Sequence, residues 1–313
     1  MPHVPPGAAG LFARNPCNSA DSAMDQREPR NQLSLTCKTH VFDLKARPCL
    51  MGIVNVTPDS FSDGGRYRDH RLAIEHGLNL AAQGADIIDI GGESTRPGSL
   101  TVKAAEELRR ILPVVRELAG PCGLAVSIDT MKADVAREAL DAGACMVNDV
   151  SALTYSPDMA SVVAEAGVPI VLMHMPAMPC DMQRHTRYGN IIAAISEFLA
   201  KRITEARATG ILQHNIIIDP GIGFGKSVDE GNFTILVRLR EFARLGYPVL
   251  VGVSRKAFIG KIAGDAEEAR DAGTAAAVTA AILNGAHILR VHNVAMMRPV
   301  ALVAHRIARF QTA

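Results

Sequence analysis

Eight short apolar runs recur along this chain of 313 residues, one about every 34 residues. They are almost continuously apolar and often β-branched, which is typical of parallel strands buried on both faces. Each run ends in polar or glycine residues, and a stretch with helical spacing follows it. The runs cover residues 49–56, 85–92, 124–130, 145–151, 168–175, 215–221, 248–254 and 287–293.

The stretches between the runs predict helices, of which the clearest cover residues 70–84, 104–120, 132–143 and 273–286. Glycine stands near the end of each, where a left-handed conformation closes the last turn. Eight strand–helix units are the number in a (β/α)8 barrel. We therefore predict this α/β fold, with loop insertions after the second, fifth and sixth strands. The alternative is an open doubly wound sheet, but no GxGxxG motif follows the first strand.

Residues 1–36 are rich in Pro, Gly, Asn and charge and show no period, so they predict a flexible N-terminal extension to one barrel domain over 37–313. No apolar run reaches the ~18 residues of a membrane span, and the N-terminus lacks the pattern of a secretion signal. The six cysteines form no CxxC pair, so we expect small buried side chains rather than a disulfide framework. We expect a cytoplasmic protein.

The composition argues against macromolecular and membrane partners. Lys and Arg number 33 against 32 Asp and Glu, for a net charge of +1, and aromatic residues make up 4% with no Trp. A nucleic-acid or anionic-membrane surface needs a basic patch, and base stacking needs aromatic side chains. We therefore expect small-molecule substrates, no nucleic acid and no membrane.

Polar side chains follow every predicted strand, at the end where barrel enzymes carry their active sites. A single strand-end Asp or Asn is explained by capping, but a convergent set from eight strands is not. The set comprises Asn55, Thr95, Arg96, Asp129, Asn148, Asp149, His174, Asp219, Ser254, Arg255, Lys256, Arg290 and His292.

The residue types in this set suggest a division of roles. Arg290 and His292 are two apart on a strand and share a face, so with Asn55 they could grip a diphosphate bridged by Mg²⁺. The other group, Asp129, Asn148, Asp219 and Lys256, suits the donor and acceptor edge of a heterocycle. The glycine-rich loops 57–65 and 91–98 are long enough to cover the mouth. The GIGFGK segment, 221–226, only superficially resembles a phosphate cradle, because it lacks the P-loop spacing.

Seven motifs in this order and spacing resemble the dihydropteroate synthase family. They are MGIVNVTPDSFSDGG (51–65), ESTRPG (93–98), SIDT (127–130), ND (148–149), DPGIGFGK (219–226), SRK (254–256) and RVH (290–292). The resemblance runs from about residue 49 to the C-terminus, and it implies a (β/α)8 transferase of folate biosynthesis that is typically a homodimer. The implied reaction condenses 6-hydroxymethyl-7,8-dihydropterin diphosphate with p-aminobenzoate to give 7,8-dihydropteroate and diphosphate.

The resemblance also implies roles for the matching residues. Asp129, Asn148, Asp219 and Lys256 would hold the pterin, Asn55 would bind Mg²⁺, and Thr95, Arg290 and His292 would contact the diphosphate. Phe61, Arg96, Pro97, Ser254 and Lys256 would form the p-aminobenzoate site, where sulfonamides would compete. Diphosphate departure would leave a pterin cation near Asp129, which the amine attacks. Asp129, Lys256, Arg290 and His292 are therefore the predicted catalytic residues, and no protein nucleophile is required.

Three positions depart from the family pattern, and they keep other functions open. Asn293 stands where the family usually has Asp, Ala257 stands where Ser is common, and segment 174–183 lacks a usual glycine and carries Pro176 and Pro179. One alternative is a non-catalytic or altered pterin-binding paralogue. The other is a pterin-dependent methyltransferase of the corrinoid type, which does not need the TPDSFSDGG and ESTRPG loops.

Overall fold

The computed structural model describes residues 33–57, 65–96 and 98–311, and the predictions for residues 1–32, Phe61 and Pro97 lie outside these ranges. Its centre is a parallel eight-stranded sheet in the order β8-β7-β6-β5-β4-β3-β10-β9. A parallel bridge between Ile218 and Val249 joins the two edges and closes the barrel. The strands are β3 (Cys49–Asn55), β4 (Ile87–Gly91), β5 (Val126–Asp129), β6 (Met146–Asp149), β7 (Ile170–Met173), β8 (Ile216–Asp219), β9 (Leu250–Val251) and β10 (Ile288–Val291).

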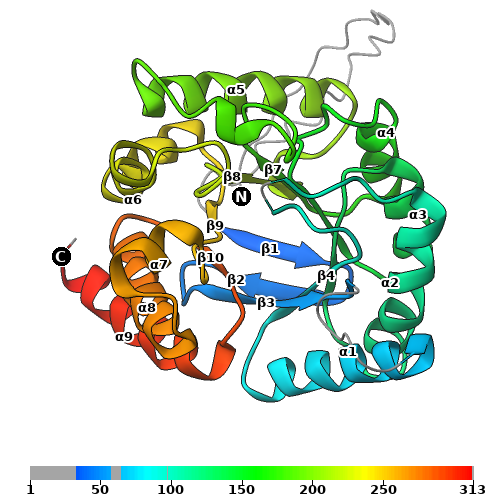
Figure 1. The fold of residues 1–313 in the computed structure, drawn as a ribbon. Helices are drawn as coiled ribbons and strands as arrows, with labels where there is room; N and C mark the ends of the chain where they lie inside the picture. The colour runs from blue at the N-terminus through cyan, green and yellow to red at the C-terminus, as the bar shows by residue number, and fades with distance from the viewer. Residues whose placement is uncertain (1–32, 58–64, 97, 312–313) are drawn as a thin grey trace, which may run out of the picture. The chain divides into compact units, whose positions relative to one another are not determined.

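Helices surround the strands, as the sequence predicted (Figure 1). They are α1 (Gly65–Ala82), α2 (Ala104–Ala119), α3 (Ala133–Asp141), α4 (Met159–Ala166), α5 (Ile191–Ala208), α6 (Thr234–Val237), α7 (Ala257–Ala263), α8 (Glu267–Leu283) and α9 (Val294–Gln311). Short 3₁₀ or π turns are η2 (Met182–Arg184), η3 (Gln213–Asn215), η4 (Val228–Phe233) and η5 (Leu239–Leu245). The predicted (β/α)8 fold is confirmed, and long loops follow β4, β7 and β8 as expected.

Three of the four predicted glycine caps are confirmed. Gly84, Gly143 and Gly285 have φ values of +97°, +119° and +96°, the left-handed region in which glycine carries no penalty. Gly120 directly follows the last residue of α2 as predicted, but the left-handed conformation expected for it is wrong, because its φ is −80° and its N–H donates to the carbonyl of Arg116. The left-handed residue after α2 is Gly123, with φ +61°.

An antiparallel hairpin that the sequence analysis missed precedes the barrel. It consists of β1 (Ser34–Cys37) and β2 (His40–Asp43), so residues 34–36 form a strand although they were assigned to the extension. Leu35, Cys37 and Leu44 pack on apolar residues near the starts of the barrel strands, including Cys49, Ile87, Cys145 and Ile288. The hairpin therefore closes the end of the barrel opposite the predicted site. Its strands are too short to show a clear period.

Of the cysteines in the described ranges, Cys37, Cys49 and Cys145 are buried as expected, Cys122 is half-buried and Cys180 is exposed. All five are free thiols. Within the same residues, none of the helices has the length and apolar character that crossing a membrane requires.

Candidate active site

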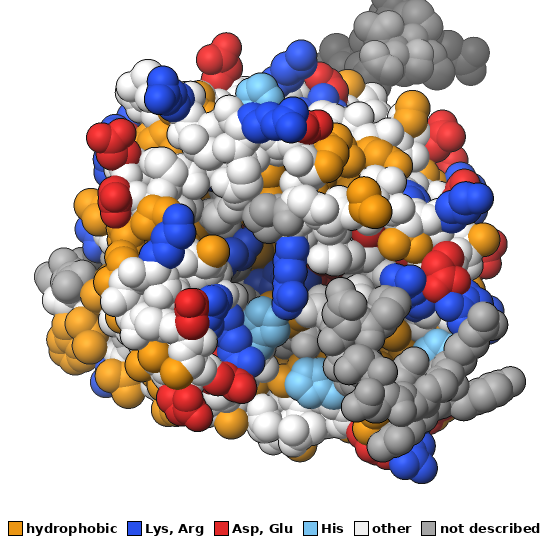
Figure 2. All heavy atoms as spheres, viewed as in Figure 1, with side chains coloured by type: hydrophobic (Ala, Val, Ile, Leu, Met, Phe, Trp, Pro, Cys, Tyr) orange, Lys and Arg blue, Asp and Glu red, His pale blue; other side chains and the backbone are white. Residues whose placement is uncertain are grey.

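The carboxyl ends of the strands surround a cavity of about 460 Å³, part of it open to solvent. In the space-filling view, Lys, Arg and His side chains gather around a hollow in the middle of the face shown (Figure 2). Eight predicted residues line the cavity: Thr95, Asp129, Asn148, Asp219, Ser254, Lys256, Arg290 and His292. Ile53, Val150, Met173 and Phe224 supply apolar walls. Apolar walls with a few convergent polar groups are usual in a small-molecule site.

A buried ion-pair network forms the floor of this cavity. Arg290 donates from Nε to Asp89 Oδ2 at 2.6 Å and from Nη2 to Asp129 Oδ2 at 2.7 Å. Asn148 donates to the same Asp89 oxygen at 3.0 Å. Burial raises the pKa of Asp129, and the charge of Arg290 opposes this effect. The Oδ1 atoms of Asp89 and Asp129 are buried without a partner, and of the two acids only Asp129 lines the cavity and could offer this acceptor to a ligand.

A second polar pair lies at the side of the cavity beneath a glycine turn. Asp219 accepts a hydrogen bond from the N–H of Gly221 at 2.7 Å, and burial raises the pKa of its carboxyl to about 6. Lys256 lies with Nζ 3.8 Å from the centroid of the Phe224 ring. Gly223 has φ +86°, and a Cβ there would lie 2.8 Å from Lys256 Cδ. Glycine at 223 therefore leaves room for the lysine beside the carboxylate.

Three N–H groups of the GIGFGK turn, residues 221–226, form hydrogen bonds within the protein itself. Gly221 donates to Asp219, Gly223 donates to Asn232 Oδ1 at 2.7 Å, and Phe224 donates to the Gly221 carbonyl. These bonds place Phe224 on the cavity wall. The segment is thus a wall of the cavity, and the superficial likeness to a phosphate cradle has no structural counterpart.

His292 and the residues around it give the cavity a positively charged side. Its Nδ1 lies 3.0 Å from Ser254 Oγ, which also accepts the His292 N–H at 3.1 Å. Burial, followed by the positive charges of Arg290, Arg255, Arg96 and Lys256, lowers the pKa of His292 to about 3. The imidazole is therefore neutral at pH 7, and the surrounding cations favour an anion at this place.

Asn55 and Arg96, both predicted site residues, do not line the cavity itself. Asn55 ends β3, and the sheet register places it and Asp129 on either side of Gly91. A Cβ at Gly91 would lie 3.8 Å from Asn55 Oδ1 and 3.7 Å from Asp129 Oδ2. The two side-chain oxygens thus share the space above Gly91, next to the buried, unpartnered Asp129 Oδ1. Arg96 is exposed on the loop after β4.

Two residues that were expected at the mouth have structural roles instead. Asp149 is buried, and it accepts hydrogen bonds from the N–H groups of Ser151 and Leu153. His174 packs edge-on against Phe198, and its Nδ1 lies 2.8 Å from Lys226 Nζ. Burial and the charge of Lys226 lower the pKa of His174 to about 3, so the ring is neutral, and burial also lowers the pKa of Lys226. Expecting both in the cavity was wrong.

The loop that carries Thr95 and Arg96 is held at its base by an ion cluster. Lys132 donates to Glu93, and to Glu107 at 2.6 Å. Glu93 also accepts the N–H of Val102 at 2.9 Å. Farther along, the N–H of Gly98 donates to the carbonyl of Pro179 at 3.1 Å, which ties this loop to the unusual segment after β7.

Sequence reasoning missed Asp89, although a signal was present. Asp89 is fully buried in the middle of β4 and binds both Arg290 and Asn148. A lone acid in the middle of an apolar strand requires a buried partner, and that requirement could have singled it out.

Comparison with known proteins agrees with this geometry. Residues 51–292 match the family of pterin binding enzymes. The chain is 46% identical to the dihydropteroate synthase of Synechocystis over 270 residues, which cover 86% of this chain and 93% of that protein. It is 41% identical to the Escherichia coli K12 enzyme over 249 residues, covering 80% and 88%.

Solved structures give the same result. The dihydropteroate synthase of Xanthomonas albilineans with 4-aminobenzoic acid superposes with a TM-score of 0.82 at 45% identity, covering 88% of this chain and 98% of that chain. The Yersinia pestis enzyme in a sulfonamide complex also gives 0.82, at 38% identity, covering 90% and 100%. The chain belongs to the dihydropteroate synthase family of pterin-binding enzymes.

Proposed function

We propose that this protein condenses 6-hydroxymethyl-7,8-dihydropterin diphosphate with p-aminobenzoate, giving 7,8-dihydropteroate and diphosphate. The observation that carries this proposal is the cavity in which Asp219, Asn148 and Asp129 lie on one side and His292 among several cations on the other. A flat heterocycle with an anionic tail is complementary to this cavity, because its ring N–H donors would face the carboxylates and its negative charge would face the cations.

The pterin occupies the buried side of the cavity. The carboxylate of Asp219 accepts paired N–H donors from the ring, and Asn148 offers an amide that can both donate and accept. Lys256 lies between Phe224 and Asp219, so its side chain limits the space on one side of the pterin ring. Because Asp89 and Arg290 fix Asn148 and Asp129 from below, these groups are oriented before the substrate arrives.

The diphosphate lies at the positive side, next to His292 and Arg290. His292 is neutral, so it contributes a hydrogen bond rather than a full charge, and the anion raises its pKa on binding. Mg²⁺, when bound, offsets charge on the diphosphate oxygens. The oxygen of Asn55 fits such an ion, since Mg²⁺ prefers oxygen ligands and usually binds through one or two protein groups plus phosphates. Among the described residues, no cluster of three or more His, Cys, Asp or Glu could hold a metal alone.

The reaction begins when the bond between the pterin methylene carbon and the diphosphate oxygen breaks, and the electron pair leaves with diphosphate. The positive charge left on the methylene is shared with the ring, and anionic Asp129 stabilises it from the cavity floor. The amine of p-aminobenzoate then forms the new carbon–nitrogen bond and loses one proton to solvent. No covalent intermediate with the protein is required.

The p-aminobenzoate site lies at the outer part of the mouth, toward Ser254, Lys256 and Thr95 of the cavity lining and the exposed Arg96 that follows Thr95. Phe61 and Pro97 belong to this site through the family resemblance. Sulfonamides, which share the aromatic amine and an acidic group, compete there; a relative from Yersinia pestis has been solved in a sulfonamide complex.

The proposal extends to a homodimer. Met296, Val303, Ile307 and Phe310 recur at helical spacing on α9 and are exposed, and an apolar stripe of this kind is typical of an interaction surface. A two-fold dimer would bury the same stripe of both copies. Sedimentation of the purified protein tests this proposal. The cytoplasmic location stays a prediction.

The test of the activity uses purified protein with the dihydropterin diphosphate, p-aminobenzoate and Mg²⁺. Diphosphate release and 7,8-dihydropteroate should appear together, and omission of p-aminobenzoate should stop product formation. Absence of both products would contradict the proposed function. Complementation of a strain that lacks this step of folate synthesis separates an active enzyme from a pterin-binding paralogue.

A further inference from the structure

Arg255 stands in a turn of unusual conformation between two cavity residues, Ser254 and Lys256. Its φ is +55°, a region that non-glycine residues adopt only when their surroundings hold them there. Residues of α8 supply that restraint. The Arg255 N–H donates to Thr274 Oγ1 at 3.0 Å, and its carbonyl accepts from Arg270 Nη1 at 2.9 Å.

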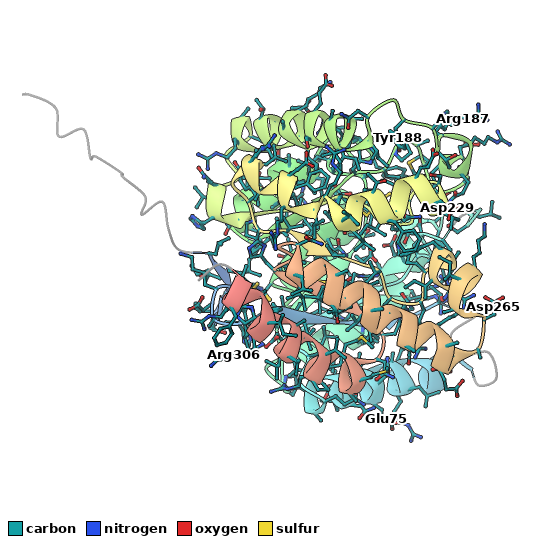
Figure 3. The ribbon with its side chains drawn as sticks, turned by 90° about the vertical axis from the view of Figure 1, so that its left-hand side faces the viewer. Glu75, Arg187, Tyr188, Asp229, Asp265 and Arg306 are labelled. Carbon is teal, nitrogen blue, oxygen red and sulfur yellow. The ribbon has the colours of Figure 1, made fainter. Side chains whose placement is uncertain are left out.

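The Arg255 side chain is held by two carboxylates of α8, the exposed Glu267, whose Oε1 lies 2.7 Å from Nη2, and the buried Asp271. Nε donates to Asp271 Oδ1 at 2.7 Å and Nη2 to Oδ2 at 2.9 Å, the two-pronged geometry of a strong Arg–carboxylate pair. Asp271 is 6% exposed. In Figure 3, Asp265, just before α8, lies at the same end of the barrel as Tyr188 and Asp229, and Tyr188 bonds the Gly225 carbonyl beside the cavity wall.

Asn293 completes the arrangement from the turn between β10 and α9. Its Nδ2 donates to Asp271 Oδ2 at 2.8 Å, and its Oδ1 accepts the N–H of Met296 at the start of α9. The position requires one donor and one acceptor, which asparagine has and aspartate lacks. An aspartate here would place two carboxylate oxygens at hydrogen-bond distance. Arg255 Nη2 and Asn293 Nδ2 already donate to the same oxygen, so a carboxylate at 293 would be within reach of the guanidinium.

We propose that Asp271 is a positioning residue for the p-aminobenzoate half of the site, and that Asp271 and Asn293 are a matched carboxylate–amide pair whose members can be exchanged. Through Arg255 they hold Ser254 and Lys256 in place, while Ser254 in turn fixes His292. The negative charge that the family resemblance leads one to expect at 293 is thus supplied from α8. The link to p-aminobenzoate rests on the proposed function, but the pairing itself does not.

The experiment compares Asp271→Asn, Asn293→Asp and the reciprocal double variant. Asp271→Asn removes the buried, two-pronged carboxylate and leaves Arg255 only its pair with the exposed Glu267, so the KM for p-aminobenzoate should rise about tenfold with a smaller change in kcat. Asn293→Asp should show a similar rise at pH 8 that shrinks toward pH 6, because the two carboxyls can then share a proton. The double variant should return to within about threefold of the parent KM. Glu241→Gln is the matched control, since it breaks an exposed Arg–carboxylate pair with Arg238 outside the cavity, and it should leave KM unchanged.

Thermal unfolding of the parent, the two single variants Asp271→Asn and Asn293→Asp, and their double variant gives a measurement that does not depend on activity. Each single variant should lower Tm, and the double variant should recover most of the loss, because the pair is restored in reverse. Additive losses, or a double variant that keeps the raised KM of Asp271→Asn, would overturn the proposal. Coupled Tm values in a protein that releases no diphosphate would support the pairing and contradict the proposed function instead.

Discussion

Asp129 precedes Arg290 by 161 residues, yet its Oδ2 accepts a hydrogen bond of 2.7 Å from Nη2 of that guanidinium. The same arginine also binds Asp89. One cation therefore links strands β4, β5 and β10 below the cavity. Of the two acids, Asp129 lines the cavity and Asp89 does not. This difference predicts that Asp129 contributes mainly to catalysis and Asp89 mainly to stability.

Asp129→Asn should lower kcat by about 10²–10³, because it removes the negative charge nearest the developing pterin cation. The fold should remain, since Arg290 keeps Asp89 and the amide preserves the shape. Steady-state kinetics with circular dichroism measures both effects. Asp134→Asn, an exposed acid on α3, is the control. Turnover close to that of the parent would remove the assigned role of Asp129.

Asp89→Asn should instead act mainly on stability. Asp89 is fully buried and accepts from both Arg290 and Asn148, so loss of its charge leaves a buried cation less compensated. We expect a loss of about 3 kcal/mol in the free energy of unfolding, larger than the loss for Asp129→Asn. Urea unfolding of both variants decides the order. A smaller loss for Asp89→Asn would show that Arg290 depends chiefly on Asp129.

The gathering of polar residues at one mouth was predictable, because parallel strands in a barrel all end on the same side. The inward or outward direction of each side chain was harder to predict. Asn148 faces the cavity while its neighbour Asp149 does not, since successive side chains on a strand point to opposite faces. An almost continuously apolar run does not show which of its residues face the barrel interior, so the sequence could not tell which of Asn148 and Asp149 faces the cavity.

The supporting residues were hidden for a different reason. Asp271 lies in a helix among residues of ordinary surface character, and only the fold brings it to Arg255 and Asn293. Asn293 alone suggested a weakened enzyme. With Asp271 beside it, the same asparagine completes a satisfied network, so the departure from the family pattern no longer supports a paralogue.

Pterin affinity should depend on pH through Asp219. Burial raises its pKa to about 6 in the free protein, and ring recognition needs the ionised carboxylate. As pH falls through about 6 the carboxyl gains a proton, and the affinity should drop by up to tenfold per pH unit. Calorimetric titration with a pterin lacking the diphosphate, between pH 5 and 8, measures this. If Asp129→Asn shows the same pH profile, the pH dependence of pterin affinity belongs to Asp219. If the profile of Asp129→Asn is flat, the pH dependence belongs to Asp129.

Binding of Mg²⁺ should require the diphosphate, because the described residues offer Asn55 as an oxygen ligand but no cluster of three His, Cys, Asp or Glu. Calorimetry with Mg²⁺ alone should show weak binding, and diphosphate should strengthen it at least tenfold. Asn55→Ala should raise the Mg²⁺ concentration needed for half-maximal activity, while the affinity for a pterin without diphosphate stays unchanged. Tight Mg²⁺ binding to the free protein would contradict this assignment, and so would an Asn55→Ala variant with the parent's Mg²⁺ requirement, since either result would place the ion on groups other than Asn55 and the substrate.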